Sequence, residues 1–128
     1  MPFTLLATLS QVTNHRPFRF GVQASTAPSG KAWADLARRT EDLGYAVLTM
    51  PDHFTDQLAP VPAMTVAAHV TKNLRVCALV FDNDYKHPVV LAKELATMDV
   101  LSDGRIDIGI GAGWMRTDSD QAGMQYDT

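Results

Sequence analysis

One run of sequence decides the fold class: Leu74-Arg75-Val76-Cys77-Ala78-Leu79-Val80. It carries apolar side chains on both of its alternating faces, which is typical of a parallel strand that is covered on both sides. Further strand patterns lie at 18–23, 46–50 and 105–111, and a helical spacing of apolar residues separates each pattern from the next. Strands that alternate with helices in this way predict βαβ units and a parallel sheet.

Residues with special backbone preferences mark the ends of the expected helices. Ser29 can cap the first helix, and Gly44 can end it because glycine tolerates the positive φ of a residue that follows a helix. Pro62 and Pro88 are expected at the starts of the next two helices, where the missing N–H of proline costs nothing. Residues 102–104, Ser-Asp-Gly, predict the turn before the last strand.

The spacing of the strands limits how the sheet can close. They begin near residues 18, 46, 74 and 105, so that they recur every 28 to 31 residues. Right-handed crossovers leave two main closures, the doubly wound sheet and the barrel. A barrel needs eight β–α units and typically ~250 residues. With residues 1–17 taken as a loose N-terminal extension, residues 18–128 hold about four units, which would form the N-terminal half of a TIM-type (β/α)8 barrel.

The composition excludes several classes of protein. Hydrophobic residues make up 46% of the chain, which is globular rather than disordered composition. The net charge of −3 argues against a nucleic-acid or membrane-surface partner, and no apolar run approaches the ~20 residues that span a bilayer. The single cysteine, Cys77, excludes an internal disulfide. We therefore expect a reduced, cytoplasmic setting and a small-molecule substrate.

The loops at the carboxyl ends of the strands are where a parallel α/β fold places its chemistry. Asp52 and His53 directly follow the second strand pattern. A histidine there can act as an acid or a base near neutral pH, and an adjacent carboxylate can support it. The alternative is structural: Asp52 would cap the loop backbone and His53 would be a packed ring.

The remaining histidines and acidic residues give weaker signals. Asp82 and Asp84, together with His53 and His87, suggest a metal site, but the His-x-His and His-Glu-x-x-His spacings are missing, so we expect no metal. His87 precedes a proline at a helix start and is expected to cap or pack there. His69 falls inside a helix and is expected to be structural or solvated.

The glycine-rich stretch 109–113, Gly-Ile-Gly-Ala-Gly, invites a dinucleotide-binding interpretation. The fingerprint requires a third glycine at the position of Trp114, and it belongs on the first strand rather than the fourth. We therefore reject that interpretation. We expect the glycines to let the strand end and its loop pass close under a flat ring. The alternative is tight packing of the strand against a helix, and the two are compatible.

Six motifs occur in order over residues 18–127: Phe20–Gln23, Ala37–Tyr45, Pro51–Phe54, His87–Glu94, Asp99–Arg105 and Gly109–Trp114. Together they resemble the luciferase-like monooxygenase family, whose members use flavin or the deazaflavin coenzyme F-420. The resemblance is greatest to the deazaflavin-dependent oxidoreductase branch. It implies a barrel, which favours that closure over the doubly wound sheet.

The resemblance also implies a redox cofactor that lies across the carboxyl-terminal mouth of the barrel. In similar proteins the Asp-His pair touches the cofactor ring, and His53 would be the catalytic residue that transfers a proton. A non-proline cis peptide would join Ala78 and Leu79 behind the ring. The cofactor-binding residues that the resemblance implies are Asp52, Ala78, Leu79, Phe81, Ala112 and Gly113.

The activity implied by the resemblance is hydride transfer between a deazaflavin, or alternatively FMN, and a small organic substrate. Trp114 stands where the sugar-phosphate dehydrogenases of the family carry a proton-transferring glutamate, which argues against that substrate. The family's main phosphate-binding loops come from later strands. The alternative is a non-catalytic remnant or assembly partner, because a half-barrel leaves its first and fourth strands as open edges that favour self-association.

Overall fold

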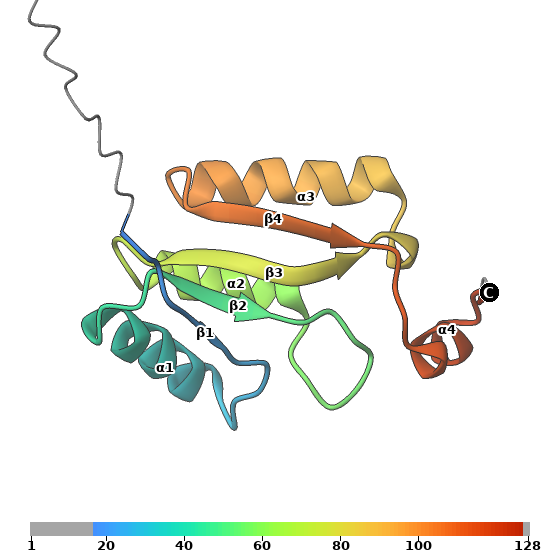
Figure 1. Cartoon of the computed structure of the whole chain (residues 1–128), viewed down its shortest axis with the longest axis horizontal. Coiled ribbons are helices and arrows are strands. Elements are labelled where there is room, and N and C mark those ends of the chain that lie inside the picture. The colour runs from blue at the N-terminus through green and yellow to red at the C-terminus, as the bar shows by residue number, and fades with distance from the viewer. Residues whose placement is uncertain (1–16, 127–128) are drawn as a thin grey trace, which may run out of the picture.

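The computed structural model of the chain describes residues 17–126 (Figure 1), so the expected N-terminal extension lies, apart from its last residue, outside the described residues. Strands and helices alternate along the chain, as the sequence predicts. The elements are β1 (Gly21–Gln23), α1 (Gly30–Asp42), β2 (Val47–Met50), α2 (Pro60–His69), β3 (Arg75–Asp82), the short 3-10 helix η1 (Asn83–Tyr85), α3 (Pro88–Leu101), β4 (Ile106–Gly111) and α4 (Arg116–Ala122).

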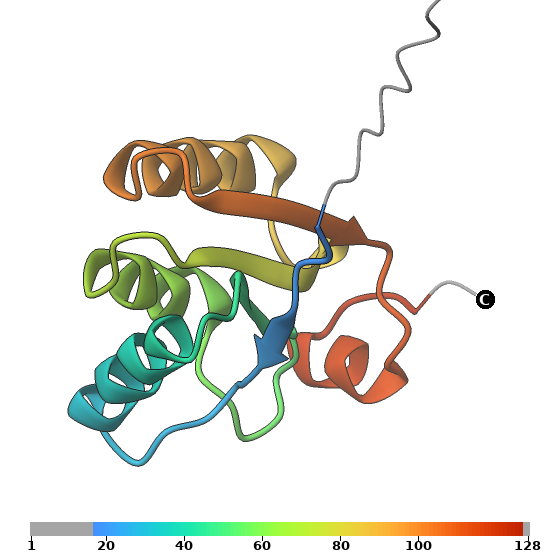
Figure 2. The same cartoon turned by 60° about the vertical axis from the view of Figure 1, so that its left-hand side comes forward.

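The four strands form one parallel sheet in the order β1-β2-β3-β4. Helices α1, α2 and α3 lie side by side on one face of this sheet (Figure 2). A doubly wound sheet reverses its strand order and carries helices on both faces. The unreversed order and the single helical layer are those of one wall of a barrel, which confirms the prediction of four β–α units from the N-terminal half of such a fold.

The first helix begins and ends where the sequence predicts. The Ser29 hydroxyl oxygen accepts a hydrogen bond from the backbone N–H of Ala32 at 3.1 Å, and Gly44 takes a φ of +82° just beyond the last turn. Trp33 then fixes α1 on α2, because its indole N–H donates to the carbonyl oxygen of Ala63 at 2.7 Å. The strand before this helix is shorter than predicted, since it covers only 21–23 of the expected 18–23.

The predicted start is two residues late for α2 and correct for α3. Helix α2 begins at Pro60 rather than at Pro62, and both prolines lie in its first turn, where their missing N–H groups have no helical partner to lose. Helix α3 begins at Pro88, and the side chain of His87 caps it by accepting a hydrogen bond from Val89 N–H at 3.3 Å. The expected capping role of His87 is confirmed.

The two faces of the sheet differ in character. The face that carries the helices is a buried apolar layer, whereas a row of Thr49, Cys77 and Asp107 lies on the other face. Arg75 and Asp107 form an ion pair at the amino-terminal end of that second face, with 2.6 Å between Nη2 and Oδ1. The core consists of Leu48, Met50, Val76, Ala78, Phe81 and Ile106 from the strands and Trp33, Ala37, Ala63, Met64, Ala67, Ala68, Leu91, Leu95 and Met98 from the helices, together with Leu74.

Within residues 17–126, none of the helices combines the length and the apolar character needed to cross a membrane.

Candidate functional site

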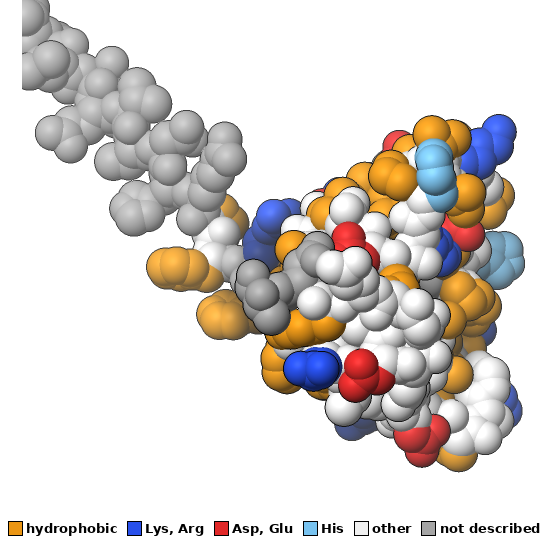
Figure 3. Space-filling view, turned by 90° about the vertical axis from the view of Figure 1, so that its right-hand side faces the viewer, with side chains coloured by type: hydrophobic (Ala, Val, Ile, Leu, Met, Phe, Trp, Pro, Cys, Tyr) orange, Lys and Arg blue, Asp and Glu red, His pale blue; other side chains and the backbone are white. Residues whose placement is uncertain are grey.

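A pocket of about 240 Å³ lies at the carboxyl ends of β2, β3 and β4, the edge where a parallel sheet of this kind places its chemistry. Helix α4 lies just beyond the same edge (Figure 1). Figure 3 looks onto this end of the molecule, where histidine rings reach the surface among hydrophobic side chains. The pocket is lined by Asp52, His53, Leu79, Val80, Asp82, Gly111, Ala112, Gly113 and Trp114.

The central contact of the site joins His53 to Asp118. His53 follows β2, whereas Asp118 lies in the first turn of α4, and 2.7 Å separates Nδ1 of the histidine from Oδ2 of the carboxylate. Asp118 is only 1% exposed. A buried carboxylate of this kind requires hydrogen-bond donors around it.

Two further donors complete the surroundings of Asp118. The Tyr85 hydroxyl, from η1 after β3, donates to Oδ2 at 2.7 Å, and the backbone N–H of Phe54 donates to Oδ1 at 3.3 Å. The rings of Phe54 and Tyr85 pack with their centroids 4.3 Å apart. One carboxylate therefore connects the loops that follow three successive strands.

The hydrogen bonds determine which groups are ionised. Burial raises the pKa of the Asp118 carboxyl, but the hydrogen bonds from Tyr85, His53 and Phe54 outweigh burial and hold that pKa below its ordinary value. Burial, together with the hydrogen bond to the Asp118 carboxylate, raises the pKa of the Tyr85 hydroxyl far above its ordinary value. At neutral pH Asp118 is an anion and Tyr85 is a neutral donor.

The pKa of the Asp52 carboxyl is shifted in the opposite direction to that of Asp118. It is half-buried in the pocket wall and accepts a hydrogen bond from the backbone N–H of Asp82 at 3.2 Å. Burial dominates here and raises the pKa of Asp52, with the charge of Asp82 adding to the effect. The pocket thus holds one carboxyl group whose charged form is disfavoured, near a second, deeper one whose charged form is favoured.

The space beside the glycines of β4 and of the loop after it is filled by other atoms of the protein. A Cβ on Gly109 would overlap the carbonyl oxygen of Ala78, and one on Gly111 would overlap the Val80 side chain, so these glycines allow close packing of β4 against β3. Gly113 takes a φ of +75°, and a Cβ there would overlap the Asp82 carboxylate. The packing alternative of the sequence analysis therefore holds, but against a strand rather than a helix.

The cis peptide expected in the third strand lies one position later than predicted. It joins Leu79 and Val80, not Ala78 and Leu79. The strand register shifts between Ala78 and Phe81, so that the strict alternation of faces is broken there. As a result Leu79 and Val80 both line the pocket, and they are 55% and 37% exposed.

Two residues expected at the cofactor lie elsewhere. Ala78 is fully buried and Phe81 is 2% exposed, and both belong to the apolar layer between the sheet and the helices. Neither residue lines the pocket, and their place behind a cofactor ring stays a prediction. The pocket brings together the other five, which are Asp52, His53, Leu79, Ala112 and Gly113.

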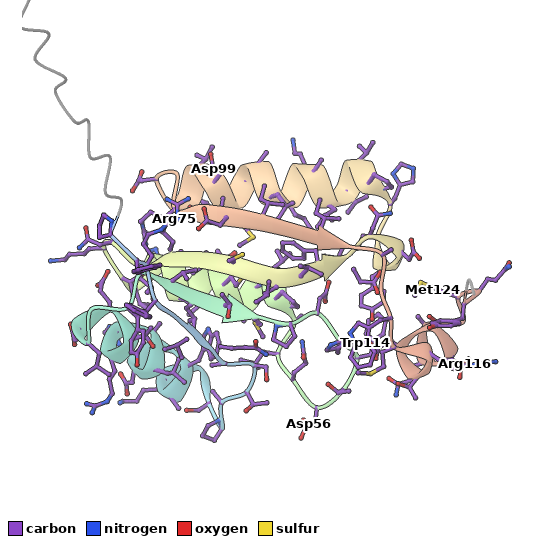
Figure 4. The ribbon with its side chains drawn as sticks, viewed as in Figure 1. Asp56, Arg75, Asp99, Trp114, Arg116 and Met124 are labelled. Atoms are coloured by element: carbon purple, nitrogen blue, oxygen red, sulfur yellow. The ribbon has the colours of Figure 1, made fainter. Side chains whose placement is uncertain are left out.

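Trp114 forms the outer wall of the pocket. It is 71% exposed, and its ring meets the edge of the His53 ring at 90°, with 5.9 Å between the centroids. In Figure 4 its side chain lies between α4 and the loop that follows β2, at the opposite end of the sheet from Arg75.

Asp118 is the functional residue that the sequence analysis missed. The last motif of the sequence analysis ends at Trp114, and Asp118 lies beyond it, on the helix that follows. Nothing in the local sequence shows that α4 folds back over the second loop. Among residues 17–126 no three His, Cys, Asp or Glu side chains converge as metal ligands, and His87 caps α3 rather than joining Asp82.

The pocket can hold a flat ring beside a proton-transferring group. Leu79 and Val80 supply an apolar floor, Trp114 an aromatic wall, and His53 a ring nitrogen suited to accept or return a proton. These residues fit the ring of a flavin or deazaflavin. Its phosphate would need other residues, because no lysine or arginine lies among the described residues that line the pocket.

A larger hollow, of about 520 Å³, lies on the face of the sheet that carries the helices, between α3 and β4. It is lined mainly by apolar side chains, among them Leu91, Leu95, Ile108 and Ile110. Its position outside the sheet, away from the strand ends, is where a barrel packs its next helix. We therefore place the chemistry in the smaller pocket.

Comparison with known proteins yields one family. A model of the luciferase-like monooxygenases matches residues 2–128. The solved structure of the coenzyme F420-dependent tetrahydromethanopterin reductase from Methanopyrus kandleri superposes with a TM-score of 0.75 at 26% identity, which covers 84% of this chain and 30% of that one.

The names of two proteins with similar sequences give different cofactors. The F420-dependent glucose-6-phosphate dehydrogenase of Amycolatopsis mediterranei is 30% identical over 107 residues, which cover 74% of this chain and 31% of the relative. The oxygenase component of the flavin-dependent trigonelline monooxygenase of Acinetobacter baylyi is 40% identical over 72 residues, 54% of this chain and 20% of the relative. The chain spans less than half the length of the curated relatives it matches.

Proposed function

The chain belongs to the luciferase-like monooxygenase family, and on that premise we propose that it forms part of an oxidoreductase active site. The reaction is hydride transfer between a deazaflavin of the F-420 type and a small organic substrate, with FMN as the alternative cofactor. The observation that carries this proposal is the His53 ring, which is tied to Asp118 at 2.7 Å on the wall of a pocket with an apolar floor.

Each group of the pocket has a task under this proposal. The cofactor, when bound, supplies the hydride chemistry. His53 takes up or returns the accompanying proton at Nε2, since Nδ1 is engaged with Asp118. Leu79 and Val80 support the ring from below, and Asp52, Ala112 and Gly113 lie at its edge. Trp114 closes the outer side and keeps water away from His53.

The test is a titration of the chain with the deazaflavin and, separately, with FMN, followed by absorbance and fluorescence of the ring. We expect the deazaflavin to bind more tightly, and His53→Ala to weaken that binding several-fold. His69→Ala is the matched control, because His69 is exposed on α2 and lies away from the pocket. The absence of binding by both cofactors, or equal binding by His53→Ala and the unchanged chain, would overturn the proposal.

A second candidate role is assembly with another polypeptide to complete a barrel. The observation that favours it is the free edge at β4, where Ile108 and Ile110 are 53% and 56% exposed beside the apolar hollow against α3. Open strand edges with apolar side chains favour pairing. Size-exclusion chromatography with light scattering tests this role: we expect a self-associated species, and a stable monomer at micromolar concentration contradicts it.

We place this function in the cytoplasm. The single cysteine is half-buried and not in a disulfide, and burial raises the pKa of its thiol, which keeps it in the unreactive thiol form. A chain whose cysteine is retained as a thiol suits a reducing compartment.

A further inference from the structure

We propose that Asp118 is a positioning residue that fixes the neutral His53 ring in the tautomer with its proton on Nδ1. Nε2 is then the unprotonated nitrogen, ready to accept a proton. The use of this nitrogen in a reaction rests on the proposed function, whereas the tautomer itself does not.

The chemistry of the carboxylate carries the first step. An ionised carboxylate can only accept hydrogen bonds, so the nitrogen that lies 2.7 Å from Oδ2 of Asp118 must carry the proton. The hydrogen bonds to Asp118 hold its pKa below the ordinary value, which keeps the group ionised at neutral pH. The assignment of the proton to Nδ1 follows directly.

The second step is that Asp118 cannot easily reorient. Its Oδ2 accepts from both His53 and the Tyr85 hydroxyl, and its Oδ1 accepts from the Phe54 backbone N–H. Three donors from two different loops hold one buried carboxylate. Tyr85 also stays protonated, since burial and the Asp118 carboxylate raise its pKa far above the ordinary value.

The third step concerns the other ring nitrogen. No hydrogen bond to Nε2 of His53 is formed by any group within residues 17–126, and the His53 side chain, 21% exposed, lines the pocket. Nε2 is therefore available to a molecule that enters the pocket. A fully buried histidine, by contrast, would need a partner for each ring nitrogen.

An amide in place of the carboxylate tests this directly, because the side chain introduced by Asp118→Asn cannot satisfy all three donors. If its NH₂ group faced Phe54, two N–H groups would meet. If the NH₂ group takes the place of Oδ2, it donates to the Tyr85 oxygen and to Nδ1 of His53. The second arrangement avoids the clash, and it requires an unprotonated Nδ1. We therefore expect Asp118→Asn to move the proton of neutral His53 to Nε2.

The experiment is ¹⁵N NMR of the histidine rings in the chain, with no cofactor added and at a pH where the rings are neutral. We expect the ring shifts of His53 in the unchanged chain to show a protonated Nδ1 and an unprotonated Nε2. His53→Ala identifies its signals. In Asp118→Asn we expect the two shifts to exchange roles. In Tyr85→Phe, which keeps the carboxylate, we expect the original pattern.

Asp120→Asn is the matched control, since Asp120 lies on the same helix but is exposed. It should leave the pattern unchanged. A protonated Nε2 in the unchanged chain overturns the proposal whether or not any variant folds, and so does an unaltered pattern in a folded Asp118→Asn variant. Because none of these readouts involves a cofactor, the proposed redox function can fail while this inference holds, and the reverse.

Discussion

The Asp118 carboxylate lies 2.7 Å from Nδ1 of His53, although 65 positions separate the two residues in the chain. The contact forms because the chain after β4 turns back across the strand ends and brings α4 against the loop that follows β2. The site is therefore made by the arrangement of parallel strands, whose carboxyl ends all meet at one edge.

Gly113→Ala should destabilise the fold by about 1–3 kcal/mol. Gly113 takes a φ of +75°, and an added Cβ would overlap the Asp82 carboxylate, so that both the backbone and the side-chain packing oppose the change. Urea unfolding measures the loss. Gly30→Ala is the control, because that position has an ordinary φ and open space around it. Equal stability of the two variants would show that the glycine is not required.

Trp114 and Trp33 should respond differently to a ligand in the pocket. Trp114 is 71% exposed at the pocket wall, whereas Trp33 is 2% exposed and its indole N–H bonds the Ala63 carbonyl. In ¹H–¹⁵N spectra of the chain titrated with the deazaflavin or FMN, we expect the Trp114 indole signal to shift and the Trp33 signal to stay. Trp114→Phe assigns the two signals. A shift of Trp33 alone would place the ligand elsewhere.

Asp52→Asn should stabilise the fold at neutral pH. The pKa of Asp52 is raised by burial, so ionisation costs folding free energy as the pH rises from the unfolded value near 3.8 through the higher folded value. The amide carries no charge and avoids this cost. Urea unfolding between acid and neutral pH should show a gain that is largest at neutral pH and vanishes in acid. A loss of stability at neutral pH would contradict the assignment.

Asp107→Asn should show the opposite dependence on pH. The hydrogen bonds from Arg75 lower the pKa of Asp107, so its contribution is present above the unfolded value near 3.8 and is lost as the pH falls through the folded value. Because the pair is partly exposed, we expect a loss of about 1 kcal/mol or less at neutral pH. The same unfolding series measures it, and a loss that grows toward acid would be the contrary result.

Ile108→Lys should reduce self-association through the free edge at β4. A charged side chain on an edge strand opposes pairing with another chain. Light scattering after size exclusion should show a shift toward the monomer relative to the unchanged chain. Val89→Lys is the control, because Val89 is 70% exposed on α3 and does not line the hollow beside β4. Identical masses for the unchanged chain and the two variants would show that the β4 edge does not take part in self-association.

The repeating elements could be predicted from the sequence because local residues determine them. Ser29 and Gly44 define α1 through a cap and a positive φ, and neither depends on distant contacts. The period of the strands then indicated four parallel β–α units. Pro60 shifted the start of α2 by two residues, since either proline is acceptable in a first turn.

The errors in the site come from tertiary structure. The register shift between Ala78 and Phe81 turns Leu79 and Val80 to one side and returns Phe81 to the core, and no alternation pattern shows such a shift. Asp118 was missed because its donors lie in other loops. Sequence position alone located His53, but its partner required the folded chain.

The bonds of Asp118 also determine how this part of the fold can be exchanged during evolution. The carboxylate belongs to the fourth β–α unit, and its donors belong to the second and third. Recombination that replaced the second or third unit with a sequence lacking His53 or Tyr85 would leave the buried Asp118 charge short of a donor. The smallest heritable block that preserves the site is therefore three consecutive units, from β2 to α4.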